Sequence, residues 1–165
     1  MNFPGQIRKC RVLLFVLLII PVLLYSEQQT AENFPVYNLK GERKIFYRLI
    51  ESLPDNGLAI VNFTSVTCLP CKKEIPELKA LAESKGGEVM LLCIYAETAD
   101  QVKTSAASLG VEENAYVDPF GAIRNKFNIT KFPVTIVIDK KYKIIGRYEG
   151  YTRKNINGIK KICGM

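Results

Sequence analysis

Three short and almost uninterrupted apolar runs stand out along the chain. They cover Leu58–Phe63, Val89–Tyr95 and Val134–Ile138. A strand that is buried on both faces of a sheet is apolar at nearly every position, so each run is predicted to be a central strand. Shorter extended segments are predicted at Val36–Leu39, Ala115–Val117 and Lys143–Tyr148, and the last of these forms a β-hairpin with the third apolar run.

Between the strands, apolar residues recur at three- and four-residue intervals, which predicts helices with one buried face. Pro54, Gly86 and Gly110 stand where three of these helices end, and Thr152 is suited to cap the last one. The helices are marked by the apolar sets within Ile45–Leu53, Ile75–Ala82, Val102–Leu109, Ile123–Phe127 and Ile156–Ile162. Strands that alternate with helices imply parallel crossovers, and the final hairpin adds an antiparallel edge. We therefore expect an α/β fold with a mixed central sheet and helices on both faces.

Residues 1–26 have the layout of a targeting segment rather than of a folded domain. A basic cluster at 8–11 precedes the apolar stretch 12–24, and no charged residue occurs from 12 through 26. At about 1.5 Å per residue these uncharged residues span about 22 Å of helix, which is less than a hydrocarbon core of about 30 Å. The length favours a signal peptide that is cleaved, and a retained N-terminal signal anchor through 12–24 is the alternative.

The basic flank predicts that the N-terminus stays inside and that the rest of the chain is exported. The polar segment 27–33 is expected to be a linker, and residues 34–165 are expected to form the folded domain. The destination is then the periplasm or the outer face of the cytoplasmic membrane, as a secreted or a membrane-anchored protein.

The chain has 165 residues, of which 48% are hydrophobic and 24% charged, a balance typical of one globular domain. Its formal charge is +7, but much of the basic excess is scattered near the C-terminus, without interleaved aromatic residues or a nucleic-acid motif. We interpret this excess as a solvated surface and expect no nucleic-acid partner.

The sequence contains no histidine but five cysteines. The absence of imidazole excludes Ser-His and Cys-His catalytic arrangements and every His-ligated metal site. The chemistry is therefore expected on cysteine sulfur, without a resident metal or other cofactor. Cys93 lies inside an apolar run and is expected to be a buried, inert thiol, whereas Cys163 lies near the end of the chain and is expected at the surface. The sequence does not decide whether these two cysteines form a disulfide with each other.

Cys68 and Cys71 form a C-x-x-C pair that directly follows a predicted buried strand and opens an amphipathic helix. The free N–H groups and the positive end of the helix dipole then point at Cys68, which stabilises its thiolate and lowers its pKa. Cys71 lies one turn along the helix, so Cys68 is the candidate nucleophile and Cys71 the resolving thiol. A zinc site would need two further ligands, and a structural disulfide gains little entropy from closing so short a loop, so both alternatives are disfavoured.

The segment 61–76, Val-Asn-Phe-Thr-Ser-Val-Thr-Cys-Leu-Pro-Cys-Lys-Lys-Glu-Ile-Pro, resembles the thioredoxin superfamily. Within it, the chain is similar to the TlpA/ResA/DsbE-like group of membrane-associated thiol-disulfide oxidoreductases over about residues 34–163. Pro76 matches the family's proline five residues after the second cysteine, and Phe132-Pro133 stands at the place of the family's cis-proline. The segment 96–118 resembles the insertion of TlpA-like members. The resemblance therefore implies a thioredoxin-like fold with a TlpA-type strand-helix insertion.

The chain departs from the family pattern beside the cysteine pair. Thr64 and Thr67 stand where relatives often carry tryptophan, so the active-site surface is expected to be more polar. Asn62 replaces the buried acid of thioredoxin. Glu74 matches a glutamate of the TlpA/ResA-like group, which implies that it relays a proton to or from Cys71 and holds up the pKa of that thiol. The other interpretation of Glu74, a carboxylate on the helix surface paired with a nearby lysine, stays open.

The resemblance also assigns the contacts with substrate. The Phe132–Pro133 peptide bond is expected to be cis, which would set both residues against Cys68. The backbone of Phe132 could then pair strand to strand with an extended segment of the substrate. Leu69 and Pro70 lie between the two cysteines and complete the expected substrate-binding set.

By resemblance, the chain is an exported enzyme that exchanges a Cys68–Cys71 disulfide or dithiol with exported partner proteins that carry disulfides or dithiols. The common direction in the group is reduction, for example of apocytochrome c before haem attachment, with electrons from a membrane thiol carrier. The alternative is a non-enzymatic module of the same fold that binds Cu(I) or a protein, since two thiolates can hold Cu(I). Copper chaperones of this fold typically add a histidine, which this chain lacks. Peroxide reduction is disfavoured because no Pro-x-x-x-Thr precedes Cys68.

Overall fold

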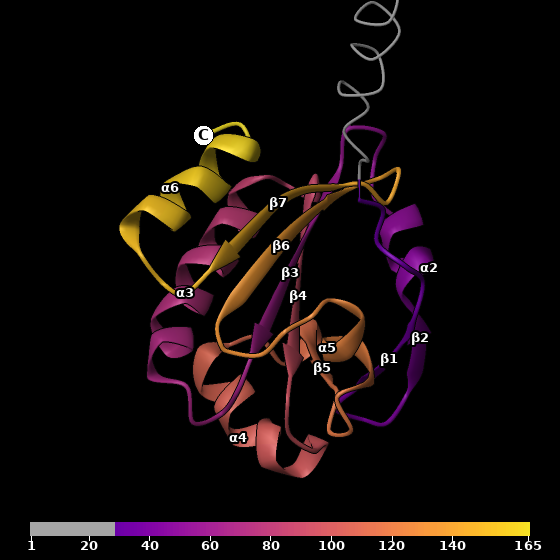
Figure 1. Ribbon diagram of the computed structural model, residues 1–165, viewed down its shortest axis with the longest axis vertical. Coiled ribbons are helices and arrows are strands. Elements are labelled where there is room, and N and C mark those ends of the chain that lie inside the picture. The colour runs from indigo at the N-terminus through magenta and orange to yellow at the C-terminus, as the bar shows by residue number, and fades with distance from the viewer. Residues whose placement is uncertain (1–28) are drawn as a thin grey trace, which may run out of the picture.

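Seven strands lie side by side in one sheet within residues 29–165, the part of the chain that the computed structural model describes (Figure 1). Their spatial order is β2-β1-β5-β4-β3-β6-β7. The strands are β1 (Pro35–Asn38), β2 (Arg43–Ile45), β3 (Leu58–Thr64), β4 (Val89–Tyr95), β5 (Ala115–Val117), β6 (Val134–Asp139) and β7 (Ile144–Glu149). The predicted targeting segment 1–26, with its apolar stretch 12–24, lies outside the described residues.

The central strands β3, β4 and β5 run parallel, whereas β1 is antiparallel to β5 and β6 is antiparallel to β3. Thr64 pairs with Tyr95 and Tyr95 with Val117, so the carboxyl ends of the three parallel strands lie in one row. Because β6 runs the other way, it starts at this same edge, where Val134 pairs with Phe63. The predicted mixed sheet is confirmed, and one edge of it collects the loops that carry chemistry.

Helices cover both faces of the sheet (Figure 1). They are α2 (Phe46–Glu51), α3 (Leu69–Ser84), α4 (Ala99–Leu109), α5 (Ala122–Lys126) and α6 (Arg153–Ile162), with a short 3₁₀ turn at Glu112–Asn114. The period-2 alternation of β3 supplies both cores: Val61 and Phe63 pack with α2 and α5, and Ile60 packs beneath α3, α4 and α6. A strand that is apolar on both sides is therefore buried on both sides.

The segment 96–118 supplies α4 and β5, so the expected insertion extends the sheet by a third parallel strand. Gly110 ends α4 in the left-handed conformation, with φ of 61°. Thr152 caps α6, because its side chain accepts a hydrogen bond from the Asn155 N–H at 3.1 Å. Pro76 lies inside α3, as the family pattern predicts.

The N-terminal part of the described chain differs from expectation in two ways. β2 was not predicted, because it has only three residues and two of them, Arg43 and Lys44, are charged. The segment expected to be a linker packs on the domain from residue 29 onward. Ala31 is buried, its N–H donates to the Tyr142 carbonyl at 2.7 Å, and Thr30 forms a β-bridge with Lys143. Within residues 29–165, no helix has the length and apolar character needed to cross a bilayer.

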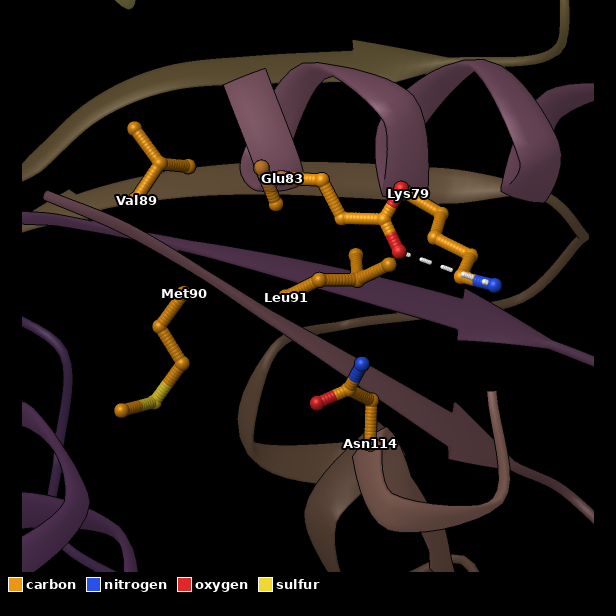
Figure 2. A pocket seen from close by; sticks show the side chains of 7 residues that line it. Lys79, Glu83, Val89, Met90, Leu91 and Asn114 are labelled. Atoms are coloured by element: carbon orange, nitrogen blue, oxygen red, sulfur yellow. Dashed lines mark ion pairs between the residues drawn. The ribbon is translucent and has the colours of Figure 1, made fainter. Parts of the chain in front are cut away.

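A shallow pocket of about 210 Å³ lies beside the second half of α3 and the beginning of β4 (Figure 2). Lys79 and Glu83 form an ion pair of 3.7 Å across one side of it, and Met90 and Asn114 lie on the other sides. This volume is smaller than that of most small-molecule sites, about 300–1,000 Å³. The pocket lies toward the end of α3 that is farther from Cys68, so it contributes nothing to the cysteine pair.

The double burial of β3 predicts a large effect of truncating its central aromatic residue. Phe63→Ala should lower the free energy of unfolding by about 3–5 kcal/mol, because the Phe63 ring is fully buried and packs 5.4 Å from the Phe127 ring. Urea unfolding followed by circular dichroism measures the change. Phe120→Ala is the matched control, since Phe120 is 93% exposed, and it should change the free energy by less than about 0.5 kcal/mol. Equal losses in the two variants would contradict this assignment of the core.

Candidate active site

Cys68 and Cys71 form a disulfide at the start of α3, with an S–S distance of 2.01 Å and Cα atoms 5.3 Å apart. Cys68 is the N-cap residue of the helix, and its Sγ accepts a hydrogen bond from the Cys71 N–H at 3.2 Å. This sulfur therefore takes one of the N–H groups that the first helical turn leaves free. In the reduced protein the same N–H group and the helix dipole favour the thiolate of Cys68 over its thiol.

The two sulfurs differ in their access to solvent. Cys68 is half-buried, and the residues between the cysteines are exposed, with Leu69 70% exposed. Cys71, by contrast, is 0% exposed and faces the core under α3. An incoming disulfide can therefore reach Cys68 but not Cys71.

A loop fixed by hydrogen bonds leads from β3 into the cysteine pair. The Ser65 carbonyl accepts from the Cys68 N–H at 3.1 Å, and the Ser65 hydroxyl accepts from the Thr67 N–H at 3.3 Å. The same hydroxyl donates to the carboxylate of Glu97, which follows β4. Sequence reasoning did not single out Ser65 or Glu97. The predicted parallel pairing of β3 with β4 was the available signal, because it brings the residues after both strands together.

The Phe132–Pro133 peptide bond is cis, as the resemblance implied. Pro133 is buried, and its carbonyl accepts a hydrogen bond from the Gly150 N–H at 2.8 Å. Phe132 is half-buried, and the guanidinium of Arg124 lies 5.9 Å from the centre of its ring. β6 starts directly after Pro133, and its first residue pairs with the last part of β3. Phe132 and Pro133 therefore lie at the same end of the sheet as Cys68, which follows β3.

Glu74 is buried rather than on the helix surface, so its interpretation as a lysine-paired surface carboxylate is wrong. It is 1% exposed and lies one turn after Cys71, on the same inner side of α3. The Asn62 side-chain amide donates to its Oε2 at 2.8 Å, and the Thr135 hydroxyl donates to the same oxygen at 3.3 Å. Burial raises the pKa of Glu74 to about 7, because desolvation outweighs the two hydrogen bonds, which lower it, and nearby Glu77 raises it further.

Asn62 and Thr135 support Glu74 from neighbouring strands. They pair directly in the register between β3 and β6, and the Asn62 amide also donates to the Thr135 hydroxyl at 2.9 Å. Asn62, identified in the sequence only as a departure from thioredoxin, thus holds a carboxylate that comes from the helix. Thr135 was not predicted, because it is hidden in an apolar run 73 residues along the chain from Asn62.

These features are shared with proteins of one family. A family model described as the AhpC/TSA family matches residues 27–147. The chain belongs to this thioredoxin-like family. A curated relative, the thiol-disulfide oxidoreductase ResA of Bacillus anthracis, is 31% identical over 137 residues, which cover 80% of this chain and 76% of that protein. ResA of Geobacillus kaustophilus is 28% identical over 67% of this chain and 62% of its own length.

Solved structures agree on the fold. The thioredoxin domain of a thiol-disulfide oxidoreductase from Bacteroides vulgatus superposes with a TM-score of 0.69 at 18% identity, covering 83% of this chain and 97% of that one. A thiol:disulfide interchange protein from Chlorobium tepidum gives a TM-score of 0.68 at 20% identity, covering 84% and 95%. The fold is thus thioredoxin-like. With the Cys68–Cys71 pair at disulfide distance, this member of the AhpC/TSA family is a thiol-disulfide oxidoreductase.

The other two cysteines of the described part of the oxidoreductase are free and buried. Desolvation raises the pKa of the Cys93 thiol to about 12, and nearby Glu74 adds to this shift. Cys163 was expected at the surface but lies under the last turn of α6 with the core residues of that face. The two cysteines do not form the disulfide that the sequence left open. No group of three or more His, Cys, Asp or Glu side chains within residues 29–165 is arranged to hold a metal ion.

The raised pKa of Glu74 predicts how stability changes with pH. The folded oxidoreductase holds the Glu74 proton up to a pKa of about 7, whereas the ordinary value is 4.5. Ionisation therefore destabilises the fold as the pH rises through this window, and the penalty is absent below it. Glu74→Gln cannot ionise. Its stability relative to wild type should rise by up to about 3 kcal/mol between about pH 4 and pH 8.

Urea unfolding of the oxidised protein at both pH values measures this difference. Glu83→Gln is the matched control, because Glu83 lies on the same helix with its side chain 66% exposed. A Glu74→Gln difference that stays constant with pH, or that falls as the pH rises, would contradict the burial of an ionisable carboxylate at this position.

Proposed function

We propose that the protein is an exported reductase of protein disulfides, in which Cys68 attacks the partner and Cys71 releases it. The observation that carries the proposal is the contrast between the two sulfurs. Cys68 is half-buried at the start of α3, and Cys71 is 0% exposed one turn from the buried carboxylate of Glu74. An accessible thiolate and a shielded thiol are what the two successive steps of thiol–disulfide exchange need.

In the first step, the Cys68 thiolate attacks one sulfur of the partner's disulfide. A bond forms between Cys68 Sγ and that sulfur, the partner's S–S bond breaks, and the second partner sulfur leaves as a thiolate. The exposed side chains of Leu69 and Pro70 lie beside the reacting sulfur. Phe132 and Pro133 offer the backbone against which an extended partner segment pairs as an added strand.

In the second step, Cys71 loses its proton and attacks Cys68 Sγ. The mixed disulfide breaks, the Cys68–Cys71 disulfide forms, and the partner leaves with both of its sulfurs reduced. Glu74 receives the proton of Cys71 through its carboxylate, whose pKa of about 7 is close to neutrality. Two electrons from a dithiol carrier then reduce the Cys68–Cys71 disulfide for the next cycle.

The location in this proposal rests on the N-terminal charge and hydropathy pattern, and the partners rest on the resemblance to the TlpA/ResA-like group. The basic cluster at 8–11 and the apolar stretch 12–24 favour export, by a cleaved signal or with a retained membrane anchor. The partners are then exported proteins with disulfides, such as apocytochrome c before haem attachment. The electron donor is a thiol carrier in the membrane.

Single cysteine variants test the order of the two steps. In a Cys10→Ser background, Cys71→Ser should accumulate a mixed disulfide with a protein disulfide such as insulin, because nothing resolves it. Cys68→Ser should form none, and both variants should reduce insulin more than about a hundredfold more slowly than the parent. Non-reducing gels and mass spectrometry measure the adducts. Equal activity of the parent and Cys68→Ser, or an adduct only in Cys68→Ser, would overturn the proposal.

Glu74→Gln tests the proton transfer separately from the attack. The variant should form the mixed disulfide at the parent's rate but resolve it about a hundredfold more slowly near pH 8. Below a pH of about 7, Glu74 of the parent is protonated and cannot accept a proton, so the advantage of the parent over the variant should shrink. Quenched-flow alkylation gives both rates. An unchanged resolution rate in Glu74→Gln would remove Glu74 from the mechanism.

A further inference from the structure

A small apolar groove opens between β1, β5 and the loop that leads to α5. It has a volume of about 140 Å³ and is lined mainly by Phe34, Pro35, Tyr37, Pro119, Phe120 and Ile123. Phe120 is 93% exposed and Tyr37 is 42% exposed. An aromatic pair at the rim of an apolar hollow is a feature of binding surfaces, since exposed apolar patches are rare without a partner.

The groove lies at the same end of the sheet as the cysteine pair. Tyr37 pairs with Val117, which continues the row Thr64–Tyr95–Val117 to a fourth strand. Strands are about 4.8 Å apart, so the row places Tyr37 about 14 Å from Thr64. Cys68 follows the end of β3 and Phe120 follows the end of β5, and the carboxyl ends of these parallel strands lie in the same row.

Helix α5 joins the groove to the substrate contacts proposed above. Ile123 lines the groove, and the next residue, Arg124, lies over the ring of Phe132. Arg124 is held by Asp118, which accepts its backbone N–H at 2.9 Å and pairs with its guanidinium at 3.4 Å. Two successive residues of α5 therefore connect the lining of the groove with the segment before Pro133.

The groove selects an apolar occupant of limited size. The charged groups beside it are already paired, Lys126 with Glu32 and Asp118 with Arg124. Its volume is below the range of about 300–1,000 Å³ that small molecules and cofactors occupy, so it suits a single side chain. An extended chain advances about 3.3 Å per residue, and about four residues therefore span the distance along the row.

We propose that this groove binds an apolar side chain of the partner protein, about four residues along the chain from the partner cysteine that exchanges with Cys68. The inference rests on the proposed function, in which the partner segment lies across the Phe132–Pro133 edge. Phe120 and Tyr37 make the groove a determinant of which disulfides the enzyme prefers.

Activated peptides test the proposal on the full-length chain in a Cys10→Ser, Cys71→Ser background. Each ten-residue peptide carries one cysteine as a mixed disulfide with thionitrobenzoate, and has leucine or serine four residues to either side. Attack of Cys68 on the peptide sulfur forms a new disulfide and releases coloured thionitrobenzoate. A leucine peptide should react about tenfold faster than its serine counterpart, because leucine is buried as the peptide docks.

Phe120→Ser should abolish this preference while reacting at the parent's rate with Ellman's reagent, which has no peptide to dock. Met165→Ser is the matched control, since Met165 is 64% exposed at the C-terminus, and it should keep the preference. Equal rates for leucine and serine peptides, or a preference that survives in Phe120→Ser, would overturn the inference. So would a self-association of the parent, seen by sedimentation, that Phe120→Ser removes. Absence of any Cys68 reaction with Ellman's reagent would instead overturn the proposed function itself.

Discussion

The start of helix α3 at a cysteine is the constraint on which the rest of the site depends. Because Cys68 takes the N-cap position, its sulfur receives an N–H group of the first turn and stays within reach of solvent. The same helical period then turns Cys71 and Glu74 inward, one turn apart. Burying Glu74 is unfavourable for the ionised carboxylate, and Asn62 and Thr135 offset only part of that penalty. The helix thus keeps the sulfur of Cys68 within reach of solvent and places the sulfur of Cys71 and the carboxyl group of Glu74 in the interior.

The sequence predicts the elements that have strong periodicity. β4 and β5 have the predicted bounds, and β3 and β6 are each one residue longer than predicted. The prediction works because these apolar runs are buried on both faces of the sheet. The C-x-x-C pair and the helix after it identify the reactive sulfurs by local physics alone. The cis bond before Pro133 came from resemblance to a family and not from any pattern in the chain.

The features that were missed depend on contacts between distant segments. The packing of α3 on β3 and β6 decides whether Glu74 faces water or the core. Helical spacing alone is compatible with both a buried and a surface carboxylate. In the sequence, Thr135 is one position of an apolar strand. Its role as a partner of Asn62 follows only from the pairing of the two strands. Ser65 becomes notable only because β4 brings Glu97 beside it. These contacts depend on which distant segments become neighbours in the fold, and the local periodicity of one segment does not identify those neighbours.

The outer strand β2 has a consequence for how the molecule meets unfolded chains. An unpaired strand edge is a template for aggregation, and short length and charge are common ways of blunting it. β2 is three residues long and carries Arg43 and Lys44, and the opposite outer strand β7 carries Arg147 in the middle of its length. Without these features, unfolded chains could pair nonspecifically along the two outer strands. Both outer strands of the described sheet thus carry charges that oppose such pairing.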